Sequence, residues 1–176
     1  RDEIKIDGNA GDWANIDTEQ LVTESSNSNI DLEAVATFED ELYLSILTVT
    51  KEPLFFSPDG HTLRIFIDTD ESSETGYFVP GMGADYMVEV FGQKSPTSTN
   101  VTIMSSVLYS FDDSRDNNDW NSFFPISNVE TAAKSKHTEC RVPLFDISST
   151  QSSPKRIAWQ TSDGRADTDI SEIILG

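Results

Sequence analysis

The residues of this chain with the clearest chemical potential lie in one acidic loop. Asp68, Asp70, Glu71 and Glu74 place four carboxylates within seven residues, and Asp85 follows after a glycine-containing stretch. Carboxylate oxygens are the ligands that calcium prefers, whereas like charges at this spacing repel one another unless water or a cation neutralises them. We therefore predict a cation site that brings Asp68, Asp70 and Asp85 together, with a solvated acidic turn as the alternative.

The spacing of Asp68 and Asp70 matches the first two ligand positions of an EF-hand, but the following residues do not. Ser73 stands where the sharp-turn glycine belongs, and Val79 stands where the bidentate glutamate belongs. The flanking residues 63–68 and 85–91 have the composition of strands rather than helices. The acidic loop is therefore expected to join two strands.

The rest of the chain repeats this pattern of short strands separated by polar turns. The expected strands are residues 3–7, 20–23, 32–38, 41–50, 63–68, 85–91, 101–111, 126–133, 137–142, 156–161 and 170–175. No apolar period of 3.6 residues persists for three turns, so helix should be minor. Short strands with turn signals between them predict an all-β fold, an antiparallel β-sandwich of jelly-roll type.

Alternation within two of these strands predicts which side chains face the core. In residues 32–38 the expected buried set is Leu32, Ala34, Ala36 and Phe38. In residues 101–111 one face is expected to carry Val101, Ile103, Ser105, Val107 and Tyr109. Trp13 and Trp159 are expected in the core, and Cys140 is expected to be a small buried apolar residue.

Composition narrows the choice of partners. The 176 residues match the length of one domain, predicted over residues 1–176, and 31 acidic against 12 basic residues give a net charge of -19. Nucleic acid and anionic membrane surfaces would be repelled. No apolar run is long enough to span a bilayer. Asn100 begins an N-glycosylation sequon, which matters only in a secreting eukaryote.

Four segments, in this order, resemble the family 9 carbohydrate-binding modules and the sandwich domains that share their fold. They are IKIDGNAGDW at residues 4–13, YLSILTVT at 43–50, RIFIDTDESSETGYFVPGMGADYMVEV at 64–90 and ECRVPLFDI at 139–147. The resemblance implies a non-catalytic module of a secreted or cell-surface protein. It also implies calcium, held by Asp68, Asp70 and Asp85.

Carbohydrate binding is the function that this resemblance implies, through aromatic rings that clasp the sugar and polar side chains that bind its hydroxyl groups. The expected site is Trp120 with its neighbours Asn118, Asp119 and Asn121, in a polar loop that continues into two phenylalanines. A tryptophan that only anchors this loop is the alternative. Expected partners are a glycan end or oligosaccharide and neighbouring domains of a longer chain.

Other functions remain as alternatives. The first is a structural or adhesive sandwich of a surface or filament protein that has no sugar site. The second is a b-type haem domain of the same fold group, in which the potential axial ligands would be Met82, Met87, Met104, His61 and His137. No sequence motif of a hydrolase, metalloprotease or nucleotide-binding enzyme is present, so no catalytic residues are predicted.

Overall fold

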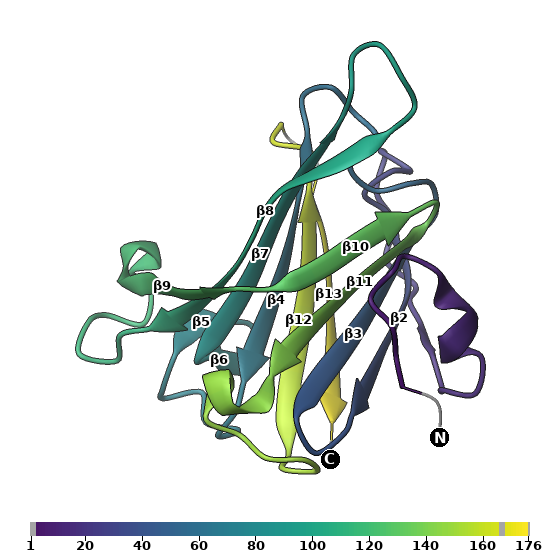
Figure 1. Cartoon of the computed structure of the whole chain (residues 1–176). Coiled ribbons are helices and arrows are strands. Elements are labelled where there is room, and N and C mark those ends of the chain that lie inside the picture. The colour runs from purple at the N-terminus through teal and green to yellow at the C-terminus, as the bar shows by residue number, and fades with distance from the viewer. Residues whose placement is uncertain (1–2, 166–167, 176) are drawn as a thin grey trace.

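The computed structural model describes residues 3–165 and 168–175, and these form two antiparallel sheets. The five-stranded sheet has the order β1 (Glu19–Gln20), β2 (Leu32–Glu39), β3 (Tyr43–Thr50), β11 (His137–Pro143), β10 (Glu130–Lys134). The six-stranded sheet has the order β13 (Thr168–Leu175), β12 (Lys155–Ser162), β4 (His61–Asp68), β7 (Tyr86–Lys94), β8 (Val101–Phe111), β9 (Phe123–Asn128). The sheets lie face to face (Figure 1), which confirms the predicted antiparallel β-sandwich.

The main core lies between the two sheets. Ile157 and Trp159 of β12 face inward with no exposed surface, as their alternation predicts, and they meet inward residues of β4 such as Ile65. Cys140 is buried in the same core from β11. Helix is confined, among the described residues, to three single turns: η1 (Ala10–Trp13), η2 (Trp120–Ser122) and η3 (Leu144–Ile147).

Both outer faces are partly covered. A small hairpin of β5 (Tyr77–Val79) and β6 (Met82–Ala84) packs on the outside of the six-stranded sheet, where it shares an apolar cluster with Phe66 and Met87. The N-terminal segment covers the outside of the five-stranded sheet and buries Trp13 there. The structure therefore has apolar layers outside both sheets, and the acidic loop contains a hairpin that the sequence prediction missed.

Three strand predictions were wrong in detail. Residues 3–7 form no strand and reach the fold through the burial of Ile4. The strand expected at residues 20–23 is only the short β1. Residues 126–133 are not one strand, because the chain leaves the six-stranded sheet at the end of β9 and enters the other sheet at β10. Val129 is buried at this crossing, which joins the two sheets.

Leu32, Ala34 and Ala36 are buried as predicted, but two bulges explain why residues predicted to share one face of a strand lie on opposite faces. The register of β2 shifts between Leu32 and Ala34, so Leu32 and Val35 both enter the main core, while Ala36 faces the N-terminal layer. The pairing of β7 with β8 shifts by one residue at Met104. Tyr109 consequently lies on the opposite face from Ile103 and packs on the outer cluster. One extra residue in a strand moves every later side chain to the other face.

A buried carboxylate lies beneath the N-terminal layer. Glu139 has no exposed surface, and its Oε2 accepts a hydrogen bond of 3.0 Å from Nε1 of Trp13. Burial raises the pKa of Glu139, the Trp13 hydrogen bond opposes this effect, and the charge of Asp12 adds to it. A carboxyl group with a raised folded-state pKa stabilises the protein fully at low pH, and this contribution is lost as the pH rises through that pKa.

Trp13→Phe should therefore destabilise the protein in a pH-dependent way. The variant removes the indole donor to the buried Glu139, and at pH 7, where the carboxyl group is more ionised than at pH 4, this loss should cost about 1–3 kcal/mol beyond the lost volume. At pH 4 the protonated carboxyl needs the donor less, so the difference from wild type should shrink. Urea unfolding at the two pH values measures this change.

Trp159→Phe is the matched control, because Nε1 of Trp159 is buried without a hydrogen-bond partner. Its cost should come from volume alone and should be the same at both pH values. An equal cost of Trp13→Phe at pH 4 and pH 7 would contradict a role for the Trp13–Glu139 hydrogen bond.

In the described part of the chain, no helix is long and apolar enough to cross a bilayer.

Candidate functional site

The three predicted aspartates meet at one end of the six-stranded sheet. Asp68 is the last residue of β4, Asp85 directly precedes β7, and Asp70 lies in the turn that follows β4. Each offers one carboxylate oxygen, and these three oxygens lie within 4.8 Å of one another. Among the described residues, Glu71 and Glu74 are not part of this group.

Hydrogen bonds hold all three carboxylates in place, and Oδ1 of Asp68 accepts one of 3.3 Å from the backbone N–H of Asp70. Oδ2 of Asp85 accepts bonds from the backbone N–H of Thr69 at 2.9 Å and from its hydroxyl group at 3.2 Å. Asp70 accepts bonds from the backbone N–H of Ser72 at 3.0 Å and from the hydroxyl group of Thr75. The cluster is therefore built into the loop rather than formed by free surface side chains.

Asp68 is the anomalous member of the group. It has no exposed surface, and its Oδ2 is buried with no hydrogen-bond partner. Burial, a side-chain hydrogen bond with Asp70 and the charge of Asp85 raise the pKa of Asp68 to about 6. Burial also raises the pKa of Asp85. A buried acceptor without a donor is costly, and a cation would remove that cost.

The geometry fits a hard divalent cation. Calcium binds oxygen at 2.3–2.6 Å, so two of its ligands can be up to about 5 Å apart, and the 4.8 Å limit of this group lies inside that span. The donor set is purely oxygen, without histidine or cysteine. The Asp68, Asp70 and Asp85 group can therefore hold a metal ion.

The small hairpin closes tightly against this loop. A side chain on Gly83 would place its Cβ 1.8 Å from the carbonyl oxygen of Thr75, and Gly76 has a positive φ of 82°. The backbone N–H of Gly76 donates a bond of 2.6 Å to Asp113 in the next loop. Only glycine permits this approach, so the two glycines position the cation loop.

Trp120 begins η2 in the β8–β9 connection and packs against the β5–β6 hairpin that adjoins the acidic loop. It is 37% exposed, and its ring meets those of Tyr77 at 5.3 Å and Phe123 at 5.4 Å in edge-on contacts. The guanidinium of Arg64 lies 5.1 Å from its centroid. Trp120 therefore anchors its loop to the outer face and still presents part of its ring to solvent.

The other residues of the predicted sugar site have mixed positions. Asn118 and Asn121 are exposed beside Trp120. Asp119 caps η2, because its carboxylate accepts a bond of 3.0 Å from the backbone N–H of Asn121. Two amides and part of one ring thus remain free at this position for a ligand.

A second polar group, which the sequence prediction missed, surrounds a pocket of about 260 Å³ at the opposite end of the sandwich. We call it the loop-end pocket, and it is lined by Asn27, Asn29, Phe56, Ser57, Asp59, His61, Asp163 and Arg165. The ring of Phe56 is 37% exposed, and a guanidinium nitrogen of Arg165 lies 2.9 Å from a carboxylate oxygen of Asp59. Amide, carboxylate, guanidinium and aromatic groups therefore converge on one concave surface.

His61 adds a neutral donor to the loop-end pocket. Its Nδ1 accepts a bond of 2.9 Å from the backbone N–H of Phe55, so the ring proton of the neutral form lies on Nε2. Burial lowers the pKa of His61, although the charge of Asp163 opposes this effect. His61 is therefore neutral at physiological pH.

The two ends of β4 separate the cation group from the loop-end pocket. His61 begins the strand and Asp68 ends it, so their backbones are about 23 Å apart at ~3.3 Å per residue. The same spacing bears on the haem alternative. His61 pairs with Gly92 and Phe66 pairs with Met87, which puts His61 and Met87 about 16 Å apart along the sheet, too far to share one iron.

No family model and no curated protein matches the sequence. Among solved structures, the fold is similar to that of a carbohydrate-binding module of family 9 from Caldicellulosiruptor kristjanssonii, which was solved in complex with cellotriose. The TM-score is 0.53 at 15% identity, and the match covers 96% of this chain and 80% of that chain. This likeness is one of fold, and it confirms the resemblance that the sequence segments indicate.

Proposed function

We propose that this chain is a non-catalytic carbohydrate-binding module, one β-sandwich domain over residues 1–176, and that calcium stabilises it. The observation that carries the proposal is the loop-end pocket, where a partly exposed ring faces amide, carboxylate and guanidinium groups. A pyranose has an apolar face that packs on a ring and a rim of hydroxyl groups that need such partners. The cellotriose complex of the structural neighbour supports the same ligand class.

The second candidate surface is the predicted group at Trp120 with Asn118, Asp119 and Asn121. Its partly exposed indole and two exposed amides favour it. The contacts of Trp120 with Arg64 and Tyr77 occupy much of the ring, and Asp119 is used as a helix cap. We therefore rank the loop-end pocket first. The location of the protein outside the cell, and neighbouring domains as partners, are further parts of this proposal.

Calorimetry and fluorescence together distinguish the two surfaces. The chain is titrated with glucose, xylose, galactose and mannose and with cellobiose and xylobiose. Trp13 and Trp159 are buried and no tryptophan lines the loop-end pocket. A change in tryptophan emission when a sugar binds therefore reports contact with Trp120. Binding in the loop-end pocket should release heat with little change in emission, and Phe56→Ala should weaken it about tenfold, ~1.4 kcal/mol.

The outcome for Trp120→Ala decides the location of the site. If Trp120→Ala abolishes binding and Phe56→Ala does not, the sugar site lies at Trp120. Lys136→Ala, an exposed charge change outside both surfaces, should have no effect. If none of the six sugars binds, carbohydrate binding is wrong, and a structural or adhesive module is the better description.

Calcium is proposed for the cation group, held by Asp68, Asp70 and Asp85. Saturating calcium at about a thousand times its dissociation constant adds about 4 kcal/mol, which raises the melting temperature by ~8 °C or more. The rise in melting temperature that calcium causes should be larger at pH 7.5 than at pH 5. Asp68 has a pKa of about 6, so at the lower pH the ion must displace its proton. Melting curves in calcium and in chelator measure both effects.

The effect of Asp68→Asn on the melting temperature should differ in sign between chelator and calcium. In chelator at pH 7.5 the variant removes a buried charge and should melt no lower than wild type, whereas in calcium it loses a ligand and should melt lower. Glu74→Gln removes the same charge from the same loop without touching the group, so it should keep the full calcium effect. If the wild-type melting curves are identical with and without calcium, the loop binds no calcium and is only a solvated acidic turn.

A further inference from the structure

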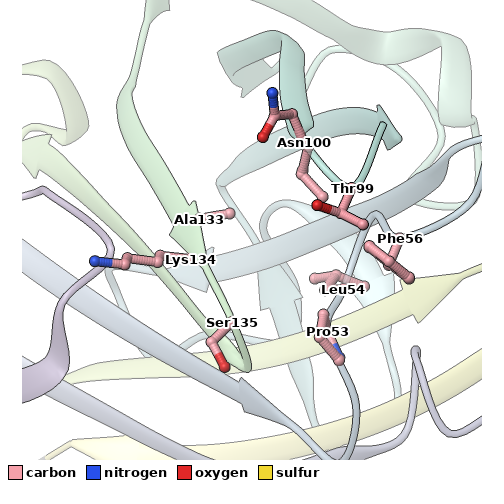
Figure 2. A pocket seen from close by; sticks show the side chains of 9 residues that line it. Pro53, Leu54, Phe56, Thr99, Asn100, Ala133, Lys134 and Ser135 are labelled. Carbon is pink, nitrogen blue, oxygen red and sulfur yellow. The ribbon is translucent and has the colours of Figure 1, made fainter. Parts of the chain in front are cut away.

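A second pocket adjoins the loop-end pocket and shares Phe56 with it. It has a volume of about 360 Å³, and we call it the hairpin pocket because three separate connections shape it. Pro53, Leu54 and Phe56 come from the β3–β4 connection. Figure 2 shows these residues on one side of the pocket, with the β7–β8 and β10–β11 hairpins supplying the rest.

The hairpin pocket has an apolar side and a polar rim. Phe56, Val101 and Ala133 contribute apolar surface, and the buried Leu54 lies beneath them. The rim carries the hydroxyl group of Thr99 and the amide of Asn100, whose side chains are both exposed, whereas the ammonium group of Lys134 points away from the pocket (Figure 2). An apolar surface beside a few polar groups is the arrangement that suits a sugar ring and its hydroxyl groups.

Phe56 joins the two pockets, because it lines both of them. Phe55 has a positive φ of 70°, a rare conformation for a bulky residue. This backbone turn buries the ring of Phe55 and leaves the ring of Phe56 37% exposed between the pockets. The two pockets are therefore parts of one surface, with an aromatic ring at their junction.

The charges of the two pockets differ. The loop-end pocket contains the carboxylates of Asp59 and Asp163, whereas the residues that line the hairpin pocket include Lys134 and no carboxylate. Lys94 lies nearby, with its Nζ 5.1 Å from the centroid of Phe56. On a chain of net charge -19, the hairpin pocket thus lacks the acidic groups of its neighbour and lies beside the ammonium group of Lys94.

We propose that the hairpin pocket is a second sugar subsite, so that the ligand is an oligosaccharide that passes over Phe56 and fills both pockets. This inference rests on the proposed function of the loop-end pocket. One sugar unit lies among Asn27, Asp59 and Arg165, and the next lies against Ala133 and the rim of the hairpin pocket. Recognition therefore depends on the length of the glycan as well as on its terminal unit.

Calorimetry with glucose, cellobiose and cellotriose and with xylose, xylobiose and xylotriose tests the proposal. The protein is produced in a host that adds no glycan to Asn100. Within the series that binds, the disaccharide should bind at least tenfold more tightly than the monosaccharide. The double variant Thr99→Ala, Asn100→Ala should weaken disaccharide binding about tenfold and leave monosaccharide binding within twofold.

Two further variants make the test specific. Lys136→Ala, on the β10–β11 turn but outside the pocket, should change neither affinity. Thr99→Trp fills the pocket from an exposed loop position and should remove the gain from the second sugar. Equal affinity for monosaccharide and disaccharide, or an equal loss of both in the double variant, overturns the second subsite while leaving the proposed function intact. Absence of binding by every sugar overturns both.

Discussion

The cost of burying a carboxylate governs one end of this molecule. Asp68 has no exposed surface and lies beside Asp70 and Asp85, so the folded chain must keep a proton on the group or bring positive charge to it. The turn after β4 is arranged around this requirement, with Thr69 and Ser72 bonding to the two neighbouring carboxylates. The structure of this turn therefore depends on how the charge of Asp68 is balanced.

The effect of that balance extends beyond the turn. The backbone from the acidic turn leads directly into the β5–β6 hairpin, and Gly76 is bonded to Asp113 in the loop that carries Trp120. Tyr77 of the hairpin then meets the rings of Trp120 and Phe123. The outer apolar layer of the six-stranded sheet is thus attached to the same turn, so loss of order at Asp68 would loosen this layer before it reached the main core.

Local patterns in the sequence were sufficient to predict most of the scaffold. Strands with strong β-formers, such as β3 and β12, have the positions that their composition indicates. The three aspartates meet because Asp68 ends β4 and Asp85 precedes β7, its antiparallel neighbour. The faces of β2 and β8 could not be predicted, since a bulge leaves no clear trace in the alternation. The change of sheet at Val129 could not be predicted either, because it depends on packing between distant strands.

The loop-end pocket was missed for a related reason. Its residues come from three connections that are far apart in sequence, and each is an ordinary polar loop residue when seen alone. Trp120 drew attention because a tryptophan among amides stands out locally, yet part of its ring serves to hold its own loop in place. Composition finds conspicuous side chains, whereas a concave site depends on how separate loops come together in three dimensions.

The hairpin pocket takes part of its wall from the turns at residues 95–100 and 134–136, and neither turn carries a buried residue of the main core cluster. The hairpins at residues 95–100 and 134–136 can therefore gain or lose residues while every inter-sheet contact stays in place. Homologues with longer or shorter hairpins would be expected to prefer glycans of different length or branching on an unchanged scaffold. A designer could exploit the same independence by exchanging one hairpin at a time to retune ligand preference.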